Sequence, residues 1–165
     1  MLIRLVDRTD LQSERRCCRL DNGELPERLQ VFYARKGDRF YTNPEAGEGA
    51  LDAMALWSLL AMGLDRKSPV AVRLADTLQA RKPESSNIYS VYHATHAMVQ
   101  MGGERWKSWE QEARERLLAA QEKEGDDSGS WPYEADRWGL GGGRVYTTAL
   151  SVMTLGIYRS DPEIR

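Results

Sequence analysis

The sequence has few of the residues that cross-link small proteins. It has two cysteines among 165 residues, and they are neighbours, Cys17 and Cys18, which cannot form an ordinary disulfide framework. No apolar run approaches the ~20 residues of a membrane span, and the charged start of the chain is unlike a signal peptide. These absences predict a protein without a membrane span, cytoplasmic by default, and exported only if the sequence is a piece of a longer exported protein.

An excess of charge of one sign is also missing. The chain has 23 basic and 25 acidic side chains, and its formal net charge is −2. It therefore lacks the broad basic surface that binds nucleic acid or anionic membranes, and we expect no nucleic-acid partner. A chain of this length can bury about 70% of its unfolded surface, which suffices for one domain without a structural metal or disulfide.

Residues 1–48 differ from the rest and predict an irregular or short β N-terminal arm. Residues 29–33 and 39–41 flank a possible hairpin turn in which Gly37 would supply a positive φ. A helix from Pro26 to about Arg35 fits as well, because apolar residues recur there at helical spacing. We favour the helix.

Residues 49–165 predict an all-α domain. Its first, third and fifth helices are nearly uncharged, whereas the second and fourth carry charge on one face only. This alternation predicts one layer of buried helices and a second layer of half-exposed ones. The expected helices cover residues 50–62, Ser68-Pro69 to before Lys82, 87–101, 104–123 and 145–158.

The helices also repeat along the chain. Helix-pair repeats bury a continuous core by stacking on their neighbours, with the odd helices inside and the even ones outside. The longer second period is absorbed by the loop at residues 124–144. A shift of 39 residues and a further shift of 54 align Ala55, Leu59, Met62 and Gly63 with Ala94, Met98, Met101 and Gly102, and then with Thr148, Val152, Leu155 and Gly156.

The loop after the fourth helix carries the most specific motif. Gln121, Gly129, Ser130 and Trp131 resemble the Q…G-x-W signature of the prenyltransferase and squalene-oxidase repeat, the helical repeat of terpenoid cyclases and protein prenyltransferase β subunits. The resemblance covers roughly residues 49–158. It implies part of an α/α toroid, with two and a half to three of the six helix pairs. Trp131 would clamp two helices, its indole N–H bound to a backbone acceptor.

The residues that carry the family's known chemistries are missing. The adjacent aspartates Asp126 and Asp127 lack the D-x-D-D pattern of a cyclase acid, and Cys17 and Cys18 lie outside the repeats, away from any zinc-ligand motif. We therefore expect no catalytic residue, cofactor or metal. The predicted function is a non-catalytic protein-interaction or hydrophobic-ligand-binding module, with a protein partner or self-association. The alternative is an isoprenoid-processing, terpenoid cyclase-like enzyme, or a fragment of one.

Several polar and aromatic side chains are candidates for ligand binding. In the enzyme alternative, the catalytic acids would come from a missing half or from Asp52 and His93 on inner helices. His93 and His96 could share a metal if a third donor approached, although a structural role is the commoner outcome. The aromatic side chains either line an apolar pocket or fill gaps between repeats. The candidates are Asp52, Tyr92, His93, His96, Trp138 and Tyr146.

Two loop segments have weaker functional interpretations. Residues 139–144 could cradle a phosphate with Arg144, but they lack G-K-[S/T] and a preceding strand, which favours a hinge or a tight backbone approach. The acidic residues at 122–127 could bind calcium, but without the spaced calcium-loop pattern we interpret them as solvated charge.

Overall fold

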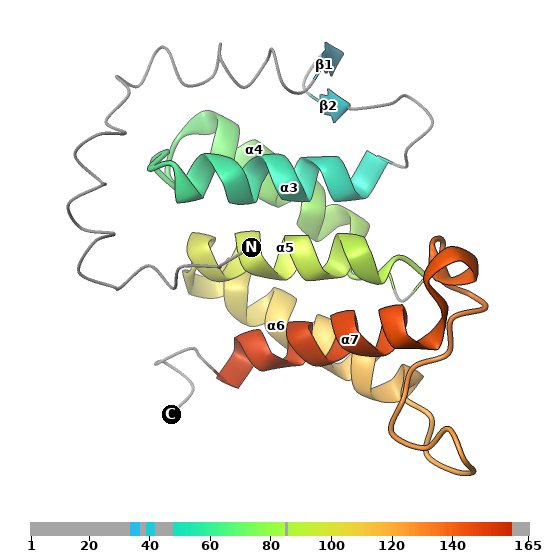
Figure 1. Cartoon of the computed structure of the whole chain (residues 1–165). Helices are drawn as coiled ribbons and strands as arrows, with labels where there is room; N and C mark the ends of the chain where they lie inside the picture. Colours follow the sequence, from blue (N-terminus) through green and yellow to red (C-terminus); the bar gives the residue numbers. More distant parts are fainter. Residues whose placement is uncertain (1–33, 37–38, 42–47, 85, 160–165) are drawn as a thin grey trace, which may run out of the picture.

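The computed structural model describes residues 34–36, 39–41, 48–84 and 86–159 (Figure 1). Five α-helices make up most of this part, which confirms the predicted all-α class. None of these described helices combines the length and apolar content needed to cross a membrane. The elements are β1 (Ala34–Lys36), β2 (Arg39–Tyr41), α3 (Glu48–Ala61), α4 (Pro69–Arg81), α5 (Ile88–Met101), α6 (Gly103–Ala120) and α7 (Gly139–Arg159).

The N-terminal arm contains a short hairpin. β1 and β2 pair antiparallel, with Arg35 opposite Phe40. The helix that we favoured is therefore wrong at its C-terminal end, because Ala34 and Arg35 lie in a strand. Pairing with β2 satisfies the backbone groups of β1, a tertiary effect that local apolar spacing does not report. The rest of that predicted helix, and Gly37, lie outside the described residues.

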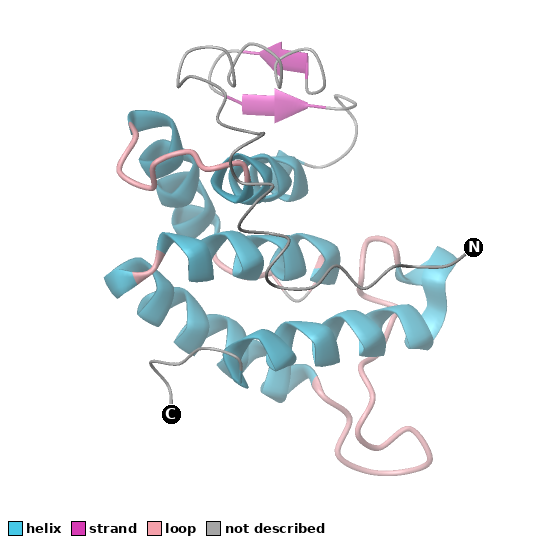
Figure 2. Cartoon of the chain, turned by 60° about the vertical axis from the view of Figure 1, so that its left-hand side comes forward, coloured by secondary structure: helices cyan, strands magenta, loops and turns pink. Residues whose placement is uncertain are grey.

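The helices form two layers. α3, α5 and α7 lie side by side and run in the same direction, while α4 and α6 lie behind them and run the opposite way (Figure 1). The loop between α6 and α7 projects from the end of this array (pink in Figure 2). β2 contacts α3 at the other end of the inner layer. The alternation of charge in the sequence thus corresponds to inner and outer helices.

The helix ends follow the expected local chemistry. Ser68 precedes α4, and its Oγ accepts the Ala71 N–H at 3.2 Å, with Pro69 in the first turn. Asn87 caps α5 by accepting the Ser90 N–H at 3.1 Å. Gly102 has φ 66° at the end of α5, a conformation that favours glycine.

The two layers meet in one hydrophobic core. Leu56 and Met98 of the inner helices are completely buried, as predicted for the uncharged helices. On α6, apolar spacing predicts a stripe of Trp106, Trp109, Ala113, Leu117 and Ala120; the first four are buried and Ala120 is half-buried. The indole N–H of Trp109 donates to Thr95 Oγ1 at 3.0 Å, so α6 is joined to α5 by a polar contact inside the core.

α7 consists of two helical pieces that meet at Gly143, where the backbone leaves helical geometry (φ 65°, ψ −172°). The longer piece follows this kink, which agrees with the predicted start at Val145, and a short piece that begins at Gly139 was not predicted. The expectation of a helix buried on most sides is wrong here, because Val145 is 82% exposed. α7 lies at the end of the inner layer and has described neighbours on fewer sides than α5.

The register of the last predicted repeat is also wrong. The 54-residue shift places Val152 over the buried Met98, yet Val152 is 54% exposed, and Gly156 lies inside α7 rather than at its end. A shift of 56 residues instead matches three buried positions of α5 with three buried positions of α7. It aligns Val91, Thr95 and Met98 with Thr147, Ser151 and Thr154.

Candidate functional site

Aromatic and imidazole rings from α3 and α5 gather in one group. Trp57 stacks on His96, with ring centroids 4.5 Å apart and planes at 15°. Tyr92 stands edge-on to His96 at 4.7 Å and to His93 at 5.2 Å. Tyr89 stands edge-on to His93 at 4.5 Å. We call these five residues the ring cluster.

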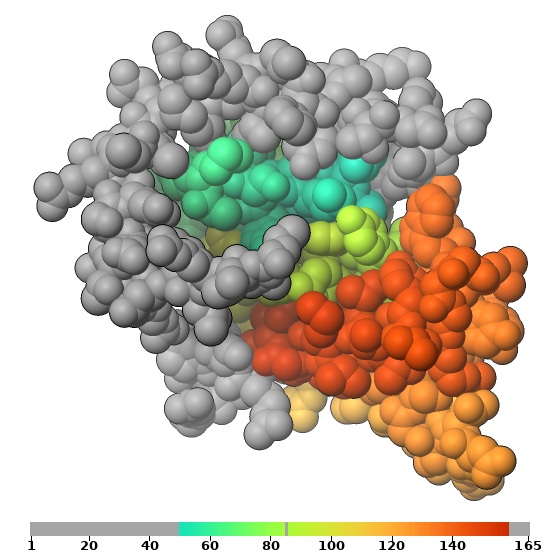
Figure 3. Space-filling view, in the orientation of Figure 1, coloured from blue at the N-terminus to red at the C-terminus, as the bar shows by residue number. Residues whose placement is uncertain are grey.

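The ring cluster lies on the side of the inner layer that faces away from α4 and α6. On α5 its members recur at helical spacing, and Tyr89 and His96 lie about half a turn around the helix from the buried Met98. Only His93 of the cluster is buried, and the other four rings are half-buried. Figure 3 views this side, where α3, α5 and α7 form adjoining bands of one surface.

The two histidines of the ring cluster favour the neutral state. Burial, with a smaller contribution from the neighbouring His96, lowers the pKa of His93 from 6.5 to about 4. Burial also lowers the pKa of His96. At pH 7 the cluster therefore presents uncharged rings, which suit apolar or aromatic carbon better than an anion. Within the described part of the chain, no three His, Cys, Asp or Glu side chains are grouped so that they could hold a metal ion.

Asp52 does not belong to the ring cluster. Its carboxylate is buried and forms an ion pair with Arg81 of α4, with Nη1 and Oδ2 3.3 Å apart. This pair links an inner helix to an outer one. The two acids of the enzyme alternative, Asp52 and His93, thus contact different sets of residues.

Tyr146 and Trp138 lie in different surroundings. Burial raises the pKa of Tyr146 to about 12, and Asp136 and Tyr89 add to the effect, so its phenol stays neutral. The hydroxyl is buried and has no hydrogen-bond partner among the described residues. Trp138 is 50% exposed, with the Arg137 guanidinium 5.6 Å from its ring centroid. Tyr146 is thus close to the ring cluster through Tyr89, whereas Trp138 lies on the loop.

Trp131 lies between α6 and α7 and contacts both. Its indole Nε1 donates to the Leu117 carbonyl of α6 at 2.7 Å, which supplies the expected backbone acceptor. Its backbone N–H donates to Thr148 Oγ1 at 3.1 Å, and its carbonyl accepts from Thr147 Oγ1 at 2.8 Å. Trp131 is 5% exposed. Beside it, Gln121 Nε2 donates to the Gly129 carbonyl at 2.8 Å, which closes the loop between them.

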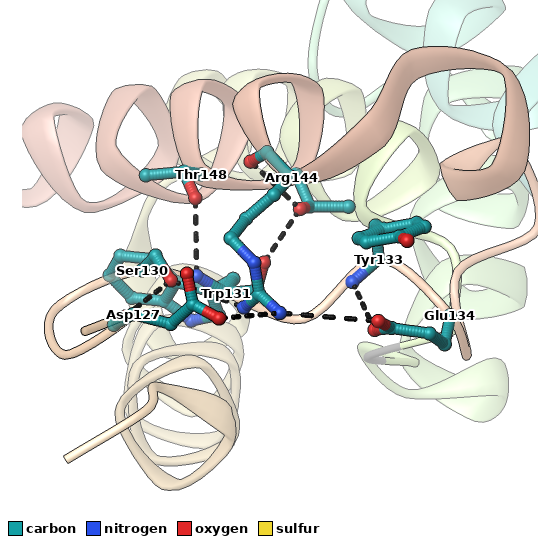
Figure 4. Close-up of polar contacts among 8 residues, drawn as sticks. Asp127, Ser130, Trp131, Tyr133, Glu134, Arg144 and Thr148 are labelled. Carbon is teal, nitrogen blue, oxygen red and sulfur yellow. Dashed lines mark hydrogen bonds and ion pairs between the residues drawn. The ribbon is translucent and has the colours of Figure 1, made fainter. Parts of the chain in front are cut away.

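Arg144 is held by the acidic loop (Figure 4). Its Nη2 lies 3.3 Å from Asp127 Oδ2 and 3.9 Å from Glu134 Oε1, and its Nη1 donates to Ser130 Oγ at 3.2 Å. The anion partners of Arg144 are thus side chains of this chain. A Cβ added to Gly139 would overlap the Tyr133 carbonyl oxygen, so the glycine-rich segment includes a tight backbone approach.

A small cavity lies between the loop, α6 and α7. It measures about 90 Å³, and Leu117, Trp131, Asp136 and Ser151 are among its lining residues. Asp136 faces no ligand, because its carboxylate accepts the Ile88 N–H at 2.8 Å and the Trp138 N–H at 2.9 Å. An apolar cavity of about 150 Å³ holds benzene, so this one is too small for a prenyl chain.

Two residues with clear roles were absent from the predicted site. Trp57 stacks on His96 in the ring cluster, but nothing in the mostly apolar sequence of its helix distinguishes it from core residues. Asp136 caps α5 from a loop 48 residues away. Its position after a turn gave no signal of that distant partner.

No family model, curated protein or solved structure matches the chain.

Proposed function

We propose that the chain is a non-catalytic binding module whose ring cluster receives a hydrophobic molecule. The observation that supports it is the gathering of four half-buried rings and one buried ring on one side of the inner layer. Rings that only filled the core would be expected to lie between the two layers, as Trp106 and Trp109 of α6 do.

The expected ligand is an uncharged apolar chain or ring. Neutral imidazoles give the cluster no fixed charge, and the stack of Trp57 on His96 offers flat carbon surface. Covering roughly 200 Å² of such surface would contribute about 5 kcal/mol before the entropic cost of binding. We therefore expect weak binding, with a dissociation constant at or above the high micromolar range.

We also propose that the helical array is an open portion of an α/α toroid, and the arrangement of the helices supports this. Three inner helices run in one direction and two outer helices run in the other, as stacked helix pairs require (Figure 1). In a toroid of this kind the inner helices line the central hollow. The ring cluster would then face that hollow.

The test is a titration with farnesol, an isoprenoid alcohol, followed by calorimetry and by NMR of the tryptophan indole N–H groups. Tyr92→Ala and His96→Ala should each weaken binding about five-fold or more, because each removes a half-buried ring. Trp138→Ala is the matched control, since it removes an exposed ring outside the cluster, and it should bind like the parent. Circular dichroism establishes that each variant is folded.

Two results would contradict the proposal. Farnesol could fail to bind at all, or Trp138→Ala could weaken binding as much as Tyr92→Ala does. The second result would move the apolar site to the loop.

A further inference from the structure

The solvent-facing side of α7 is unusual for this protein because it carries no charge. The segment from Val145 to Tyr158 contains no Asp, Glu, Lys or Arg. The exposed faces of the outer helices, in contrast, carry charged side chains such as Arg73 on α4 and Glu115 on α6. A helix face that remains in water normally carries charged side chains, as α4 and α6 do.

After the kink at Gly143, most of the exposed residues of α7 form one stripe. Val145, Ala149, Val152 and Gly156 recur at helical spacing, i, i+4, i+7 and i+11, and all are exposed. Val145 is 82% exposed and Val152 54%, with Met153 beside them at 50%. We call the first four residues the α7 stripe. Thr147, Ser151, Thr154 and Tyr158 face the other way and are buried.

The α7 stripe lies at the open end of the inner layer. At the other end β2 contacts α3, so that the first inner helix has a described neighbour beyond the layer. A head-to-tail stack of copies would need both ends free. The covered α3 end therefore favours a partner that meets α7 with the same surface, as in a closed two-fold assembly.

The order of large and small residues in the α7 stripe fits a second copy of itself. When two α7 helices run antiparallel around a two-fold axis midway between residues 150 and 151, Val145 lies opposite Gly156 of the second copy. Ala149 then lies opposite Val152 of the second copy. Each valine meets a small residue, which permits a close approach of helix axes, near 8 Å. A parallel pair would instead set each valine against the same valine.

We propose that two copies of this chain associate through antiparallel contact of their α7 stripes. The stripe is short, about 16 Å of helix at 1.5 Å per residue, so the contact is smaller than a standard stable interface. The dimer should accordingly be weak and depend on protein concentration in the micromolar range. The absence of charge removes like-charge repulsion between the two copies.

The first test is sedimentation velocity over a series from low micromolar to near-millimolar protein. The parent chain should shift from monomer to dimer across the series. Val152→Glu places a charge in the centre of the stripe and should stay monomeric throughout. Leu118→Glu is the matched control, because Leu118 is an exposed apolar residue of α6, and it should dimerise like the parent. Equal unfolding temperatures establish that the variants are folded.

The second test separates antiparallel from parallel contact. In a background with Cys17→Ser and Cys18→Ser, Ala149→Cys and Val152→Cys are made as separate proteins and mixed under mild oxidation. Antiparallel contact predicts a disulfide between the two variants and little within either one. Homotypic disulfides alone, a parent that stays monomeric, or a Val152→Glu variant that dimerises normally would each overturn the proposal. Farnesol binding by monomeric Val152→Glu tests the ligand site separately.

Discussion

Replacing Trp131 with alanine should strongly destabilise the helical array. The indole is 5% exposed and lies between α6 and α7, and its Nε1 donates to the Leu117 carbonyl at 2.7 Å. Removing a buried aromatic ring costs about 3–5 kcal/mol, because apolar burial is lost and a cavity is left. For a chain of this size, each kcal/mol lowers the unfolding temperature by about 2–4 °C. The expected shift is therefore about 6–20 °C.

The assay is urea unfolding followed by far-UV circular dichroism, which does not depend on tryptophan fluorescence. Trp131→Phe keeps most of the ring and loses the hydrogen bond, so it should cost about 1–3 kcal/mol and separate the two contributions. Trp138→Ala is the control, since half of that ring is already in water. A loss below about 0.5 kcal/mol for Trp131→Ala, as at surface sites, would refute the clamp. A loss equal to that of Trp138→Ala would do the same.

Three further outcomes are expected. Gly139→Ala should lower the free energy of unfolding in urea by about 1–3 kcal/mol, because its Cβ would overlap the Tyr133 carbonyl oxygen. Gly141→Ala, with open space around it, should be neutral or stabilising. Equal effects of the two variants would contradict the tight backbone approach at Gly139. Gln121→Ala should speed hydrogen exchange at the Gly129 amide by loosening the loop, and Gln111→Ala, whose partner Glu115 lies on the same helix, should not. The pKa of His93 is about 4 in the folded state and 6.5 ordinarily, because the folded state favours the neutral imidazole. The stability that this preference contributes is complete above pH 6.5 and is lost as the pH falls toward 4. Unfolding free energies measured across that range should fall less steeply for His93→Gln than for the parent.

Features set by neighbouring residues could be predicted from the sequence. Ser68 and Pro69 predict the start of α4, because an N-cap side chain bonds to a backbone N–H within the first turn of the helix. A backbone acceptor for the Trp131 indole was also predicted, and the structure identifies it as the Leu117 carbonyl of the preceding helix. In both cases the partners are close in sequence and the geometry allows few alternatives.

Features set by distant partners could not be predicted. Apolar spacing identified α7 but misplaced its repeat register. In the structure Thr147 Oγ1 donates to the Trp131 carbonyl, and the Trp131 N–H donates to Thr148 Oγ1, two contacts with a preceding loop that apolar spacing does not report. The stack of Trp57 on His96 depends on how α3 is rotated against α5. Asp52 was a candidate for ligand binding, and its ion pair with Arg81 depends on how α4 packs against α3.

The contacts of Asp136 limit which segment of this protein can be duplicated as a folded unit. Its carboxylate caps the first turn of α5, although it follows α6 in the chain, and the neighbouring Arg137 N–H donates to the Ser86 carbonyl at 2.8 Å. A copied segment that ended with α6 would leave the start of α5 without these partners. The smallest segment that could be duplicated or transplanted with these contacts intact therefore extends from residue 86 through residue 137, so it includes the loop after α6 instead of ending with that helix.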